Sequence, residues 1–257
     1  RSDTTWEASL PPVYGGDPAS LKRASDKRLL PVFSGQRKLE HLPLVERVAA
    51  AGAATFEVRA RTLDEARAAL EPFARVEALE LELDDYAGLA EDPARVTRAV
   101  AKTAEQAEAL LAIDATFEVV VLLNNGTAGW LEAQEALSPR IAIRQPTYER
   151  LTEALDNDVD APALFARRSW PEVPVEGLPA CVVGREPRRR PETLDTAMMR
   201  PDGHLEIFRY TKRHLLDGYR SKSLRCRACV HDPSCTGLHI NQVRAHGYRW
   251  LTPVEPS

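Results

Sequence analysis

Three cysteines close together in the last part of the chain are the residues with the clearest chemistry. Two residues separate Cys226 from Cys229, which places both thiols on one side of a tight turn. The following segment, Asp232-Pro-Ser234, favours a reversal of the backbone that returns Cys235 to the other two. Three soft sulfur ligands therefore converge, and this arrangement predicts a zinc ion or an iron–sulfur cluster.

A metal centre of either kind needs a fourth ligand, and the sequence offers two candidates. His239 follows shortly after the three cysteines and would complete with them a zinc site of three thiolates and one imidazole. The distant Cys181 is the other candidate, because a fourth thiolate suits an iron–sulfur cluster better than an imidazole does. The alternative for the whole segment is a set of buried or idle thiols that hold no metal.

The composition is that of a globular protein with interspersed charges. Of the 257 residues 44% are hydrophobic, enough for one large core or two unequal ones, and the net charge is −4. We therefore expect no nucleic-acid partner and no membrane partner, and no apolar run approaches the ~20 residues that span a bilayer. The basic segment Arg185–Arg190 is interpreted as a solvated loop. Four cysteines, three of them clustered, favour metal ligation in a reducing, cytoplasmic environment.

Strand-like and helix-like segments alternate along the first part of the chain. Short runs of apolar residues predict strands, and runs in which apolar residues recur about every 3.6 positions predict helices. Five such repeats predict an α/β fold with a parallel sheet and right-handed crossovers. The predicted strands are 29–33, 55–60, 78–83, 117–123 and 140–144, and the predicted helices are 39–51, 63–76, 92–113, 129–137 and 148–156.

Polar residues follow the predicted strands, where a parallel sheet forms its ligand sites. They are Ser34–Arg37, Arg59, Arg61, Asp84, Asp85, Asn124, Asn125, Arg144 and Gln145. Arg37, Arg59 and Arg61 would offer several donors to a carboxylate-bearing guest. The structural alternative is that the arginines pair with Glu57, Asp84 or Asp85, and that the Asp and Asn residues form turns or helix caps.

The composition changes after Trp170, and we place a domain boundary near residue 175. Residues 1–27 are predicted to form an irregular arm without a hydrophobic targeting core, and residues 28–175 form the alternating α/β domain. Residues 176–257 form a second, cysteine-rich domain. In it we expect a short strand over 177–183 that bears Cys181, and a helix near 205–219.

With these pieces assembled, the chain resembles radical S-adenosylmethionine proteins that carry a C-terminal auxiliary-cluster domain of the SPASM or twitch type. The cluster-binding end of that family is similar to Gly177-Leu-Pro-Ala-Cys181, Cys226-x2-Cys229-x5-Cys235-x-Gly237 and Arg244-Ala-His-Gly247-Tyr-Arg-Trp-Leu-Thr-Pro253. Residues 29–145 resemble the family's partial (β/α) barrel from its second strand onward. The resemblance implies a 4Fe–4S cluster with Cys181 as the fourth ligand. It also implies a single cluster, because His239 stands where the family has a further cysteine.

The chain departs from the family pattern at both sites that the radical reaction uses. The family holds its catalytic cluster with Cys-x3-Cys-x2-Cys after the first strand, whereas no cysteine precedes Cys181 in this sequence. The family's Gly-Gly-Glu-Pro, which meets the methionyl amine of the cosubstrate, is replaced by Ser34-Gly-Gln-Arg37. A fold does not carry its chemistry once the site residues are gone.

We therefore expect a non-catalytic iron–sulfur protein of radical-SAM-like fold, a pseudoenzyme that acts by binding. Its partner would be a peptide substrate or an active radical S-adenosylmethionine enzyme, held at a barrel mouth lined by Arg37, Arg59, Arg61, Asn124 and Gln145. One alternative is that the chain is part of an active radical enzyme completed by a further segment or subunit. The other is a zinc-stabilised structural module.

Overall fold

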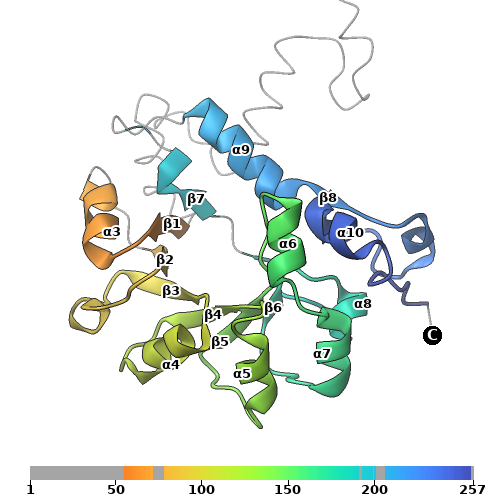
Figure 1. Cartoon of the computed structure of the whole chain (residues 1–257), viewed down its shortest axis with the longest axis horizontal. Helices are drawn as coiled ribbons and strands as arrows, with labels where there is room; N and C mark the ends of the chain where they lie inside the picture. Colours follow the sequence, from red (N-terminus) through yellow and green to blue (C-terminus); the bar gives the residue numbers. More distant parts are fainter. Residues whose placement is uncertain (1–54, 72–77, 191–192, 199, 201–205, 256–257) are drawn as a thin grey trace, which may run out of the picture.

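The computed structural model describes residues 55–71, 78–190, 193–198, 200 and 206–255 (Figure 1). The predicted strand 29–33, the predicted helix 39–51 and the segment Ser34–Arg37 lie outside the described residues. None of the helices in the described ranges combines the length and the apolar character that a membrane crossing requires.

A seven-stranded parallel sheet forms the centre of the described structure and curls into a half-barrel (Figure 1). Six strands follow one another across the sheet in chain order, and β7 pairs with the outer edge of β1. The predicted α/β class and partial barrel are therefore confirmed. The strands are β1 Thr55–Ala60, β2 Leu79–Leu83, β3 Val96–Ala101, β4 Glu118–Leu122, β5 Ile141–Arg144, β6 Val175–Glu176 and β7 Thr193–Asp195.

The two faces of this sheet differ in chemistry because successive residues of a strand point to opposite faces. The convex face is apolar, with buried side chains such as Phe56, Leu81 and Val121. Helices cover it from outside, and they are α3 Leu63–Leu70, α4 Ala104–Ala112, α5 Ala128–Ala133 and α7 Ala161–Arg167 (Figure 1). The concave face instead carries at least one charged residue on each of β1 to β6, among them Glu57, Glu80, Arg98, Glu118, Arg144 and Glu176 in strand order.

Most of the expected strands are confirmed to within one residue, but the long helix predicted over 92–113 is wrong. That range contains β3 Val96–Ala101 followed by α4 Ala104–Ala112. The β-branched Val96, Thr97 and Val100 favour a strand. Thr103 then starts the helix, because its side chain accepts a hydrogen bond from the backbone N–H of Gln106 at 3.3 Å.

The strand predicted over 177–183 is also wrong, because the strand ends earlier and a helical turn follows. Strand β6 stops at Glu176, and Gly177 has a positive φ of 79° that turns the chain out of the sheet. Pro179 then precedes the short helix α8 Ala180–Val183, which closes on Gly184 at φ 77°. Cys181 consequently lies in a helical turn.

The last part of the chain packs onto the carboxyl end of the sheet. The predicted helix near 205–219 is confirmed as α9 Ile207–Gly218. Strands β8 Arg220–Ser221 and β9 Leu238–His239 pair antiparallel around the cysteine segment, which contains the 3-10 helix η8 Leu224–Ala228. Helix α10 Ile240–His246 then contacts α6 Leu151–Asn157. Buried residues of this part join the hydrophobic core of the sheet, and the boundary near residue 175 stays a prediction.

Candidate metal centre and barrel interior

All four cysteines line one pocket, although one of them comes from a distant part of the chain. Cys181 enters from α8, Cys226 from η8, and Cys229 and Cys235 from the segment between η8 and β9. The pocket holds about 300 Å³ of space, including its opening to solvent. The remaining lining residues are Pro179, Ala180, Lys222, His231, Asp232, Leu251, Thr252 and Pro253. The structure therefore places the four cysteines that the sequence predicts as metal ligands around one pocket.

Backbone hydrogen bonds shape the cysteine segment. The Cys229 N–H donates to the carbonyl of Cys226 at 2.9 Å, and the Cys235 N–H donates to that of His231 at 2.8 Å. Gly237 allows the exit, because its φ is 78° and a Cβ there would collide with the carbonyl oxygen of Ser221. The two turns thus direct Cys226, Cys229 and Cys235 into the same pocket.

The electrostatics of the pocket oppose four free thiolates. Burial raises the pKa of the Cys181 thiol, the Thr252 N–H lowers it, and the negative charges of the other three cysteines raise it further. A bound cation or cluster would supply the positive charge that lets all four ionise together.

Backbone N–H groups already point at sulfur atoms in this pocket. The Gly237 N–H donates to Cys235 Sγ at 3.3 Å, and the Val254 N–H donates to Cys229 Sγ at 3.4 Å. Such N–H···S bonds stabilise a metal-bound thiolate and tune the potential of an iron–sulfur cluster.

The donor set fits both metal centres that accept four thiolates, a tetrahedral zinc ion and a 4Fe–4S cluster. Among the described residues, no three His, Cys, Asp or Glu side chains converge closely enough to hold one metal ion. The four thiols surround a shared pocket, so a cluster can place each of them on a different iron atom.

His239, the alternative ligand, lies outside the cysteine pocket and caps the start of α10. It is 2% exposed, and it does not line the cysteine pocket. Its Nδ1 accepts the N–H of Asn241 at 3.4 Å at the start of α10. Burial lowers the pKa of His239, and nearby Arg220 lowers it further, so the ring is held neutral. The imidazole therefore acts as a helix cap.

The two described arginines of the predicted barrel mouth are both engaged with carboxylates. Arg59 Nε donates to Glu57 Oε1 at 2.6 Å, the pairing that the structural alternative expected. Arg61 Nη2 contacts Glu65 Oε1 at 2.5 Å, a partner that the sequence reading did not consider, and its side chain is 79% exposed. Arg37 lies outside the described residues.

The Asn124 side chain stabilises the loop that follows β4 through two hydrogen bonds. Its amide Nδ2 donates to the carbonyl of Lys102 at 3.0 Å, and its Oδ1 accepts the N–H of Gly126 at 2.7 Å. The neighbouring Asn125 donates to the carbonyl of Asp156 at 2.7 Å. Both residues therefore follow the turn interpretation.

Gln145 belongs to a buried polar group between the half-barrel and the last part of the chain. Its Nε2 donates to Asp158 Oδ1 at 2.8 Å, while its Oε1 has no hydrogen-bond partner among the described residues. Asp158 Oδ2 lies 3.0 Å from His246 Nε2, and the His246 ring stacks on Trp250 with centroids 4.4 Å apart. Burial raises the pKa of Asp158 to about 6, although His246 and Gln145 act in the opposite direction.

The interior of the half-barrel is filled by a network of ion pairs. Arg98 contacts Glu80 at 2.8 Å, Glu118 at 2.8 Å and Glu176 at 2.6 Å. Arg144 reaches two of the same acids, Glu80 at 2.6 Å and Glu176 at 2.9 Å. Side chains from strands β2 to β6 thus meet on the concave face.

The segment Arg185–Arg190 contributes to this network, so its interpretation as a solvated loop is wrong. Arg188 contacts Glu118 at 2.6 Å, and Arg190 contacts Glu57 at 2.8 Å. Their side chains are 34% and 24% exposed. The segment leads from β6 at one edge of the sheet to β7 at the other, and it lies across the concave face because it contacts acids of both halves.

Glu57 shows how strongly this environment favours charged groups. Burial by itself would raise the pKa of Glu57, but Arg190, Arg59 and Arg213 together hold it well below its ordinary value. Arg213 of α9 completes the set, with Nη2 2.8 Å from Glu57 Oε1.

Sequence reasoning missed this network, although a signal was present. Charged residues recur at every second position in two of the predicted strands, as Glu57 and Arg59 in 55–60 and as Glu80 and Glu82 in 78–83. The helix wrongly predicted over 92–113 hid Arg98, and no local pattern showed that Arg188 would reach the sheet.

The comparisons with known proteins identify no family for this chain. No family model matches it, and neither a curated protein nor a solved structure matches it significantly. The resemblance to radical S-adenosylmethionine proteins therefore stays a prediction.

Proposed function

We propose that this chain holds a 4Fe–4S cluster through Cys181, Cys226, Cys229 and Cys235, and that it acts by binding a peptide or protein partner without catalysing a radical reaction. The observation that supports this most directly is the shared pocket of the four cysteines. Two Sγ atoms that already accept backbone N–H groups add to it, and so does the raised pKa of the buried Cys181 thiol, which a bound metal would lower. When bound, such a cluster would supply a one-electron redox couple and a crosslink between α8 and the cysteine segment.

A non-catalytic role is supported by what fills the half-barrel. In the described part of the concave face, four glutamates are matched by arginines, among them Arg98, Arg144 and Arg188. A cosubstrate in this space would have to displace buried ion pairs and leave charges without partners, which costs several kcal/mol per ion. These ion pairs, together with Ser34-Gly-Gln-Arg37 in place of the family motif, favour a protein that retains the fold but does not catalyse the radical reaction.

Anaerobic purification followed by metal, sulfide and absorption analysis tests the cluster. We expect about four iron and four sulfide per chain, with broad visible absorption that dithionite bleaches. One zinc per chain without iron would contradict the cluster and favour a zinc module held by the same four thiolates.

The lack of radical chemistry has its own test. The iron-loaded protein is incubated with dithionite and S-adenosylmethionine, and we expect 5′-deoxyadenosine only at the level of a control without protein. Production that disappears when Cys229 is replaced by alanine would contradict the binding role and favour the alternative of a subunit of an active radical enzyme.

A further inference from the structure

Three aliphatic side chains on the cysteine segment and the tail beside it face solvent. Leu224 is 79% exposed, Val230 is 46% exposed and Val254 is 37% exposed. Val230 and Val254 are adjacent, because the N–H of Val230 donates to the carbonyl of Val254 at 2.9 Å. Large apolar side chains that lie together on the surface mark interaction sites, and Val230 and Val254 form such a pair.

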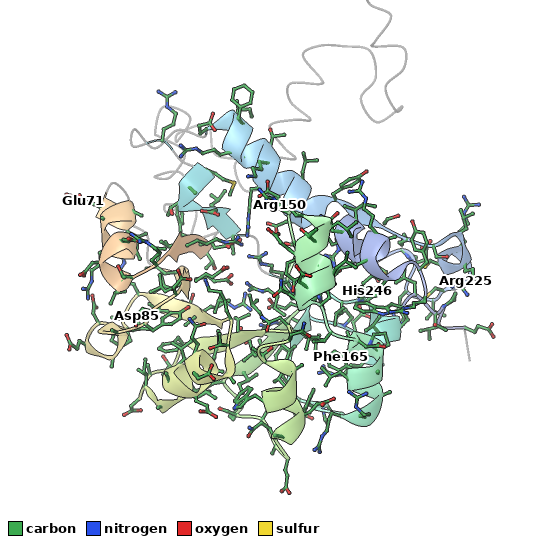
Figure 2. All side chains as sticks on the ribbon, in the orientation of Figure 1. Glu71, Asp85, Arg150, Phe165, Arg225 and His246 are labelled. Atoms are coloured by element: carbon green, nitrogen blue, oxygen red, sulfur yellow. The ribbon has the colours of Figure 1, made fainter. Side chains whose placement is uncertain are left out.

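Two basic residues follow Leu224 in the same short helix. Arg225 and Arg227 belong to η8, are exposed, and form no ion pair with another described residue. Figure 2 shows Arg225 at the outer edge of the molecule. Two acids of this region have partners of their own, because Asp232 contacts Lys222 at 2.6 Å and Glu186 lies 3.0 Å from His231. Glu255, next to Val254, is exposed.

The charge of this region contrasts with that of the rest of the chain. Residues 220–255 contain six Lys and Arg residues against two Asp and Glu residues, a net charge of +4 in a chain whose net charge is −4. A basic area on an acidic protein selects its partners by charge and orients them as they approach.

We infer that Leu224, Arg225, Arg227, Val230 and Val254 form a docking surface for an acidic protein segment with aliphatic side chains. This basic–apolar surface deepens the proposed function, on which it rests, because it specifies the chemistry of the partner. Guanidinium groups bind carboxylates in a bidentate manner, and the aliphatic side chains would cover those of the partner. Single-stranded nucleic acid fits less well, because its sites use aromatic side chains as stacking platforms, and these five residues include none.

The proposed docking surface adjoins the cysteine pocket, because the two share a turn and a hydrogen bond. The turn that presents Arg225 and Arg227 also contains Cys226, which is 8% exposed. Val254 donates its N–H to Cys229 Sγ at 3.4 Å. The partner would therefore lie directly over the proposed cluster.

Binding of defined probes to the iron-loaded full chain tests this surface by fluorescence anisotropy. The probes are a labelled peptide of interspersed Glu and Leu, the same peptide with Gln replacing Glu, and polyuridine RNA. We expect the Glu/Leu peptide to bind, to weaken as salt is added, and to bind at least about tenfold more weakly to the Arg225→Glu/Arg227→Glu variant. Leu224→Ser should weaken it about threefold or more.

The matched control is Arg67→Glu/Arg167→Glu, an equal charge change on exposed arginines of α3 and α7. It should bind the probe like the unmodified chain. Equal binding of the Gln peptide, unchanged binding by Arg225→Glu/Arg227→Glu at unchanged melting temperature, or a preference for RNA would each overturn the inference. Iron is measured in the same samples. Charge-dependent peptide binding by an iron-free chain would contradict the cluster alone, and an iron-loaded chain that ignores the peptide would contradict the surface alone.

Discussion

Glu80 and Arg144 form a bidentate ion pair across the concave face of the sheet, with Nη1–Oε1 at 2.6 Å and Nη2–Oε2 at 2.8 Å. Glu80 lies on β2 and Arg144 on β5, with β3 and β4 between them. In a flat sheet three strand spacings separate such residues by about 14 Å. The curl of the half-barrel closes this gap, and the pair in turn holds the curl.

Replacing Glu80 by Gln should destabilise the fold strongly. The change preserves shape but leaves Arg98 and Arg144, whose side chains are 7% and 6% exposed, without a principal counter-ion. We expect the free energy of unfolding to fall by about 3–5 kcal/mol, measured by urea denaturation. Glu65→Gln is the control, because its pair with Arg61 is exposed and contributes at most about 1 kcal/mol. Similar effects of both changes would contradict a network that supports the curl.

Replacing Cys181 by Ala should abolish the visible absorption and most of the iron, because the pocket loses the thiol that comes from α8. His239→Ala should retain iron and sulfide. It should lower the free energy of unfolding by about 1 kcal/mol, because α10 loses its cap. Iron lost from the His239 variant and kept by the Cys181 variant would reverse our assignment of the fourth ligand.

Gly237→Ala should disturb the cysteine segment in particular. A Cβ at this residue would meet the Ser221 carbonyl, and a φ of 78° disfavours any side chain. We expect lower iron content and a loss of more than about 1 kcal/mol of stability. Gly129→Ala in α5 is the matched control, since nothing lies within 4 Å of its Cβ position. It should leave iron unchanged and raise stability slightly. Normal iron binding by the Gly237 variant would show that this turn tolerates a side chain.

Asp158 should make stability depend on pH. Its folded pKa of about 6 lies above the value of about 3.9 in an unfolded chain, so the folded state binds more protons between these values. Its contribution is therefore present at low pH and is lost as pH rises through about 6, by up to about 3 kcal/mol.

The Asp158→Asn variant should lack this fall when the free energy of unfolding is measured at several pH values from 4 to 7. The exposed neighbour Asp156 provides the control, because Asp156→Asn should keep the pH dependence of the unmodified chain. Parallel curves for Asp158→Asn and the unmodified chain would show that Asp158 does not titrate in this range.

The sequence by itself determined the features that depend on neighbouring residues. Strands such as 55–60 and 140–144 could be predicted because their apolar character is local, and the grouping of Cys226, Cys229 and Cys235 follows from short spacings and turn residues. It left two candidates for the fourth thiol or imidazole of the site, because no pattern within one segment shows which distant residue completes a pocket.

Only the tertiary structure decided where the remaining groups lie. The turn at Gly177 carries Cys181 to the pocket, and the hydrogen bond to Asn241 places His239 at a helix end. The curl of the sheet brings Glu80 to Arg144, and the path from β6 to β7 turns Arg188 inward. Each of these contacts joins residues of separate segments, and its geometry depends on packing and curvature that the whole chain must form together.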